Sequence, residues 1–114
     1  MATSDLDTIL PLTPTVFHVL VALAAEAKHG YAIAREVEEL TEGHVVMGPG
    51  TLYGSLQRMT EAGLIKEAEN PCDRAQHAAR RRYYATTPLG QAALRAESER
   101  MVRALAVVRE RMGA

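Results

Sequence analysis

The sequence predicts a mainly α-helical fold with one small β-hairpin and a long C-terminal helix. Three observations lead to this prediction. Apolar residues recur at helical spacing in three short segments before residue 63. Two short segments, 64–68 and 81–86, then favour strands that pair as an antiparallel hairpin. The last segment, up to Met112, returns to helical spacing after a Thr-Pro pair.

The first helix is expected to follow Thr13 and Pro14. A threonine side chain accepts a hydrogen bond from a free amide at a helix start, and proline suits the first helical position. The segment from Thr15 to Ala27 then carries a broad apolar face, which is typical of a central core helix. This face consists of Val16, Phe17, Val19, Leu20, Leu23 and Ala24.

Glycines separate the next two helices. A turn is expected at Gly30, followed by a second helix from about Tyr31 to Leu40. A third helix is expected from about Thr51 to Ala62, and Gly63 ends it. The inward stripe of this third helix is predicted to be Leu52, Leu56 and Met59.

The C-terminal helix, which starts after Thr87 and Pro88, carries an apolar seam. Its members follow one another in alternating steps of three and four residues, which is typical of a coiled coil that pairs two copies. The seam residues are Leu94, Ser98, Met101, Leu105, Val108 and Met112. Small residues and adaptable methionines within the seam fit either an ordinary dimer core or a pocket for a ligand.

Three short helices and a hairpin form the order of a winged helix-turn-helix. We expect residues 1–87 to form this DNA-binding domain and residues 88–114 to form a dimerisation helix. A helix has the right width for the major groove of B-form DNA, and the third helix is the candidate reader. The alternative is that the third helix is an ordinary amphipathic helix, whose polar face contacts only solvent. The residues predicted to face DNA are Gly50, Thr51, Gly54, Ser55 and Arg58.

Arginines gather at the predicted hairpin. Arg80, Arg81 and Arg82 stand together, and Arg74 and His77 precede them. In a wing, these side chains would contact DNA phosphates and contribute affinity rather than specificity. A charged surface loop is the alternative, and strand alternation prevents all three consecutive arginines from facing DNA at once.

The bulk composition fits one compact domain. The chain has 114 residues, of which 47% are hydrophobic and 24% charged. The longest apolar run, 19–25, is too short to cross a bilayer, and the N-terminus lacks a signal-peptide pattern, so a cytoplasmic location is expected. The net charge of −1 leaves open an alternative function, a winged-helix module that contacts proteins and has little affinity for DNA.

Neither an enzyme nor a metal or cofactor site is expected. The four histidines lack the close spacing of structural zinc sites, and His18 is interpreted as a half-buried packing residue or as part of a cavity in the dimer. No serine is paired with a base by a recognisable motif, and a phosphate-binding glycine loop is absent. The single cysteine, Cys72, stands beside Arg74 and is either a redox-sensitive thiol or a chance surface residue.

Six segments resemble the short, single-domain branch of the PadR-like transcriptional regulators. They occur in that family's order: Leu12-Thr13-Pro14-Thr15, His29-Gly30-Tyr31-Ala32-Ile33, Gly48-Pro49-Gly50-Thr51-Leu52-Tyr53, Glu61-Ala62-Gly63-Leu64-Ile65, Arg81-Arg82-Tyr83-Tyr84 and Thr87-Pro88-Leu89-Gly90. The resemblance implies a homodimeric repressor that binds a palindromic operator in double-stranded DNA. It also implies that a small molecule releases this repressor from the operator. A DNA-facing or DNA-positioning role is implied for Tyr31, Thr51, Tyr53 and the arginines of the predicted wing, which are Arg80, Arg81 and Arg82.

The sequence departs from the family pattern in two places that matter. Gly54 stands where many members have proline. The chain has no tryptophan, so it lacks the flat aromatic clamp that some short members use for planar drugs. The second departure weakens the expectation of multidrug binding and leaves that of DNA binding intact.

Overall fold

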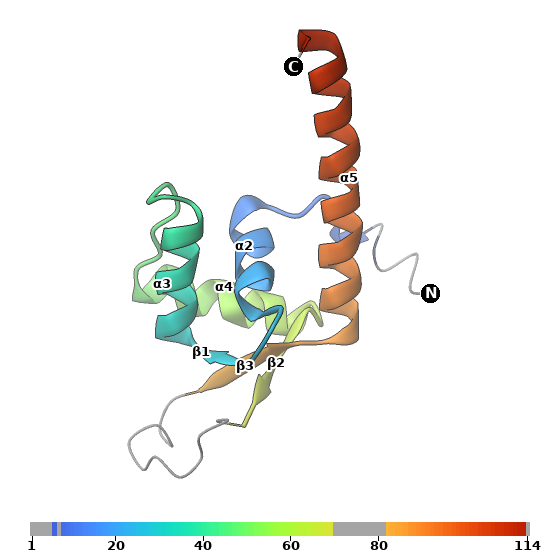
Figure 1. The fold of residues 1–114 in the computed structure, drawn as a ribbon. Coiled ribbons are helices and arrows are strands. Elements are labelled where there is room, and N and C mark those ends of the chain that lie inside the picture. Colours follow the sequence, from blue (N-terminus) through green and yellow to red (C-terminus); the bar gives the residue numbers. More distant parts are fainter. Residues whose placement is uncertain (1–5, 7, 70–81, 114) are drawn as a thin grey trace.

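The structure, a computed structural model, describes residues 6, 8–69 and 82–113 and confirms the predicted winged helix-turn-helix with a long C-terminal helix. In Figure 1, α3 and α5 lie on either side of α2, and the strands lie at one end of these helices. The elements are α2 (Pro14–Leu23), β1 (Lys28–His29), α3 (Gly30–Leu40), α4 (Pro49–Glu61), β2 (Ile65–Ala68), β3 (Tyr83–Thr86) and α5 (Pro88–Met112).

Threonine caps begin α2 and α5, as the sequence predicts. The Thr13 hydroxyl accepts a hydrogen bond from the Val16 amide at 3.2 Å, and the Thr87 hydroxyl accepts one from the Gly90 amide at 3.0 Å. Each cap is followed by a proline at the start of the helix. The cap satisfies one of the amides that a helix start leaves without a partner.

Helix α2 is shorter than the sequence suggests, because it ends at Leu23 and a bend follows it. The Lys28 ammonium donates a hydrogen bond to the Ala22 carbonyl at 2.7 Å and so satisfies one carbonyl of the last turn. The chain then enters β1, which the sequence analysis did not predict.

The predicted turn at Gly30 is wrong, because α3 begins at this residue. The His29 side chain caps the helix, since its Nδ1 atom accepts a hydrogen bond from the Ala32 amide at 3.2 Å. The glycine has a different effect: a Cβ atom at position 30 would lie 2.9 Å from the Tyr53 hydroxyl oxygen and would displace the end of that side chain. The glycine therefore lets the ring of Tyr53 on α4 pack closely against the start of α3.

The hairpin is antiparallel, as predicted, and β1 extends it to a sheet of order β1-β3-β2 within the described residues. Lys28 pairs with Tyr84, and Glu67 pairs with the same residue from the other side. Because β1 lies between α2 and α3 in the chain, the pairing joins the wing directly to the two helices that precede α4.

The core lies around α2 and receives residues from α3, α4 and the hairpin. Its largest fully buried side chains are Leu20, Leu23, Ile33, Leu56, Ile65, Val19 and Val37. Burying one such side chain contributes about 1.5–3 kcal/mol, so this cluster supplies much of the stability that holds α4 in place. None of the helices in the described residues is long and apolar enough to span a membrane.

Helix α5 has two parts with different surroundings. Its first turns bury Gly90, Ala93 and Glu97, and this part packs against α2. From Met101 onward every described residue of the chain is exposed, and in Figure 1 this part extends beyond the rest of the fold. Glu97 is thus a buried charged residue in a helix whose other glutamates, Glu99 and Glu110, are exposed.

Candidate nucleic-acid interface

Helix α4 presents an exposed face that is polar near its start. Gly50, Thr51 and Arg58 are exposed, and Tyr53 is 48% exposed. The cap residue Gly48 provides no side-chain hydrogen bond, so the first amides of α4 are not capped by it. Free amides and the positive end of the helix dipole form a suitable site for a DNA phosphate.

The prediction that Ser55 faces outward is wrong. Its side chain is buried together with Leu52, Leu56 and Met59. These four positions follow the i, i+3, i+4, i+7 spacing of one helix face, and Ser55 lies within that face because it is three residues after Leu52. Ser55 therefore contacts other protein groups, and its hydroxyl lies 3.4 Å from the Arg58 guanidinium.

Arg58 lies at a hollow between the start of α2 and α4. The hollow has a volume of about 520 Å³, and Thr15, Thr51 and Ser55 also line it. The Ser55 hydroxyl accepts a long hydrogen bond from Arg58 Nη2, which orients the guanidinium while leaving the residue exposed. Arginine in such a position can pair with a phosphate or a guanine edge.

Tyr31 and Tyr53 lie together where α3 meets the start of α4. Tyr31 is 65% exposed, and both residues line a hollow of about 340 Å³ with Arg35 and Pro49. The ring of His29 lies nearly parallel to the ring of Tyr31, at a centroid distance of 6.4 Å. The two tyrosines thus line one hollow together with Pro49, the first residue of α4.

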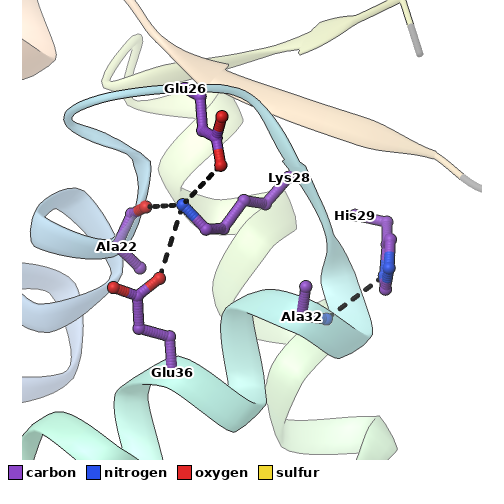
Figure 2. Close-up of polar contacts among 6 residues, drawn as sticks. All are labelled: Ala22, Glu26, Lys28, His29, Ala32 and Glu36. Carbon is purple, nitrogen blue, oxygen red and sulfur yellow. Dashed lines mark hydrogen bonds and ion pairs between the residues drawn. The ribbon is translucent and has the colours of Figure 1, made fainter. Parts of the chain in front are cut away.

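Lys28 holds the elements beneath this surface together (Figure 2). Besides the Ala22 carbonyl, its ammonium nitrogen has the Glu36 carboxylate at 3.4 Å and the Glu26 carboxylate at 3.8 Å. Its side chain is only 19% exposed, so these contacts replace most of its hydration. The lysine links the end of α2, β1 and α3, a role that could not be predicted because a lone lysine has no distinctive spacing.

The wing presents one described arginine, Arg82. Its side chain is 68% exposed, and its Nη1 atom lies 3.7 Å from the Glu67 carboxylate on β2. An exposed ion pair of this kind contributes about 0–1 kcal/mol, so a phosphate can replace the carboxylate. The predicted residues Arg80 and Arg81, together with Arg74, His77 and Cys72, lie outside the described residues.

His18 is a half-buried packing residue, as the sequence analysis interpreted it. Its Nδ1 atom is 2.7 Å from the Pro14 carbonyl oxygen, and its ring meets that of Phe17 edge-on at 5.2 Å. Within the described ranges, no three side chains of the metal-binding types gather into a cluster that could hold an ion.

The predicted seam residues lie along α5 as expected for one helical face. Leu94 and Ser98 are half-buried, and Leu94 packs against the core of its own chain. Met101, Leu105, Val108 and Met112 are exposed by 44% to 76%. No other described element covers this exposed part of the helix (Figure 1).

Comparisons with known proteins agree with this geometry. Residues 19–96 match the transcriptional regulator PadR-like family. A PadR family transcription regulator from Clostridium difficile R20291 is 25% identical with a TM-score of 0.69, and the match covers 90% of this chain and all of that one. RosR from H. salinarum is 26% identical with a TM-score of 0.64, covering 92% of this chain and 97% of that one.

A curated relative is much longer than this chain. The uncharacterized 37.1 kDa protein in transposon TN4556 of Streptomyces fradiae is 38% identical over 85 residues, which make up 75% of this chain and 22% of the relative. The chain thus spans less than a quarter of that protein's length. The family match covers both helices of the helix-turn-helix, the wing strands and the start of α5, and the chain belongs to the PadR-like family of DNA-binding transcriptional regulators, which are not enzymes.

Proposed function

We propose that this regulator is a homodimeric repressor that binds a palindromic operator and that a small molecule releases it from DNA. The exposed apolar face of α5 is the observation that carries the proposal. Met101, Leu105, Val108 and Met112 leave one helix face unburied in the single chain. Large apolar surfaces of this kind mark sites of association, and a second copy of α5 offers a matching seam.

The two parts of α5 suit a link between dimerisation and DNA binding. In this proposal, residues 1–87 form the DNA-binding domain and residues 88–114 form the dimerisation helix. The buried residues Gly90 and Ala93 fix the start of α5 to the domain, while the exposed part is free to pair. A change in the angle between two paired helices would therefore change the distance between the two α4 helices.

The proposed DNA contacts divide into two groups. Reader helices about 34 Å apart would enter successive major grooves on one side of the duplex. The wing arginine Arg82, with Arg80 and Arg81, would contact the flanking phosphates. The residues proposed to contact DNA at or near α4 are Tyr31, Gly50, Thr51, Tyr53 and Arg58.

A small molecule between the two copies would release the repressor only if it binds more tightly to a spacing that mismatches DNA. The adaptable side chains of Met101 and Met112 and the small residue Ala104 support such a site, because they allow the seam to repack around a ligand.

The pairing is tested by the substitution Leu105→Glu. We expect this variant to be monomeric in light scattering and to lose at least tenfold in affinity for operator DNA, because a carboxylate in the seam has to be desolvated. Arg103→Glu is the matched control, since Arg103 lies on the opposite side of the helix and should leave the dimer intact. A dimeric Leu105→Glu variant would refute the seam.

Repression itself is tested with a reporter gene placed behind the operator. Expression of the regulator should lower reporter output, and expression of the Leu105→Glu variant should not. If reporter output with the unchanged regulator equals or exceeds the output without any regulator, the repressor role is contradicted, although the protein could still bind DNA.

A further inference from the structure

A hollow of about 380 Å³ lies between α4 and the wing hairpin. Tyr53, Gln57 and Glu61 line it from α4, and Glu67 and Arg82 line it from the hairpin. Because α4 and the wing are the two elements that are proposed to contact DNA, the surface between them lies next to the same duplex. Gln57 was not among the residues that the sequence analysis singled out.

Gln57 belongs to the exposed face of α4. It lies four residues after Tyr53 and seven after Gly50, which are spacings of residues on one helix face. Its side-chain nitrogen donates a hydrogen bond of 3.4 Å to the Glu61 carboxylate, and both residues are exposed. This bond engages only one of the two amide hydrogens, so the second hydrogen and the amide oxygen can bind another partner.

We propose that Gln57 reads an adenine in each half-site of the operator, an inference that rests on the proposed operator binding. A glutamine amide matches the major-groove edge of adenine, because its oxygen accepts from N6 and its nitrogen donates to N7. The nitrogen carries two hydrogens, so it can donate one to Glu61 and one to adenine N7. Glu61 is then a positioning residue, since it favours the amide orientation that leaves the oxygen free for N6.

The charges around Gln57 favour a base over a phosphate. Glu61 and Glu67 place two carboxylates in the hollow, whereas Arg82 is its one guanidinium among the described lining residues. Carboxylates repel phosphate oxygens but accept hydrogen bonds from amino groups on base edges. A base edge near Gln57 is therefore the contact that these charges support, whereas a phosphate at Arg82 has to displace the Glu67 carboxylate from its ion pair.

Selection of binding sites from a randomised duplex library tests the inference. The unchanged protein should select one adenine per half-site that Gln57→Ala no longer selects, with an affinity loss of about 5- to 150-fold on the selected duplex. Gln57→Arg should select guanine at that position, because arginine pairs with guanine O6 and N7. Gln91→Ala is the matched control, since this exposed glutamine is on α5 and donates to Thr86.

The outcomes separate this inference from the function on which it rests. If the unchanged protein selects a palindrome and both Gln57 variants select the same bases, the adenine contact is refuted and operator binding stands. If a cytosine preference disappears only in Glu61→Gln, Glu61 rather than Gln57 reads the base, and the inference is also refuted. If the unchanged protein selects no sequence, both the operator and the adenine contact are refuted.

Discussion

The contact between Gly90 and Leu64 provides the sharpest test of how α5 is joined to the DNA-binding domain. A Cβ atom on residue 90 would lie 2.0 Å from the Leu64 carbonyl oxygen, whereas real Cβ contacts almost never fall below 3.0 Å. Gly90→Ala therefore requires α5 to move by about 1 Å against tightly packed backbone. The same carbonyl accepts a hydrogen bond from the Thr87 amide at 3.1 Å, which this movement would stretch.

The expected loss in the free energy of unfolding is about 2 kcal/mol. Overpacking a core position costs about 1–3 kcal/mol, and a weakened buried hydrogen bond adds about 1 kcal/mol. Alanine in place of glycine returns about 0.5–1 kcal/mol through helix propensity. Urea unfolding followed by circular dichroism measures the difference at fixed protein concentration.

Gly50→Ala is the matched control for this measurement. Gly50 also lies in the first turn of a helix, but a Cβ atom there would meet no atom within 4 Å. We expect this variant to gain about 0.4–1 kcal/mol in stability. If Gly90→Ala is as stable as the unchanged protein, α5 does not pack on Leu64 as described, and the proposed link between dimerisation and DNA binding fails.

Three other substitutions test single contacts by the same urea measurement. Lys28→Met should lower stability by about 2 kcal/mol, because the Ala22 carbonyl and the Glu36 carboxylate lose their donor; an unchanged value would show that the contacts are not formed in solution. Thr87→Val should cost about 1–2 kcal/mol through loss of the α5 cap, and no loss would contradict the cap. Glu97→Leu should gain about 1 kcal/mol, because Glu97 Oε1 is buried without a hydrogen bond and its 3.5 Å ion pair with the half-exposed Arg100 offsets only part of the cost of burying the charge; a loss would mean that this ion pair stabilises the fold.

The helix starts and the hairpin could be predicted because their signals are local. Thr13 and Thr87, each followed by proline, cap α2 and α5 as expected. Strand-forming residues around Tyr83 and Tyr84 also locate β3 correctly. In each case the residues that carry the signal for a helix start or a strand are neighbours in the chain, so the signal can be recognised without knowledge of tertiary contacts.

Features that depend on distant segments could not be predicted. β1 is only two residues long, and its pairing with β3 joins positions more than fifty residues apart. The burial of Glu97 depends on which face of α5 meets α2, and this packing joins segments that are far apart in the chain. Gly30 resembled a turn residue, although its role in the fold is to let the ring of Tyr53, on another helix, pack against the start of α3.

The candidate site was predicted in part for the same reason. The exposure of Thr51 and Arg58 follows from the helical period of α4 and was anticipated. Ser55 was misplaced because a small polar residue gives a weak signal for burial. Gln57 was overlooked because its significance comes from the wing that lies beside it.

The central claim is that two paired copies place α4 and the wing against an operator. Fluorescence anisotropy tests it most directly, with a duplex from upstream of the protein's own gene and a scrambled duplex at several salt concentrations. We expect tight binding to the first duplex only, and a slope of log affinity against log salt of about −4 or steeper, from Arg58 and Arg82 on each copy. Equal binding to both duplexes, or binding that does not change with salt, would contradict the account.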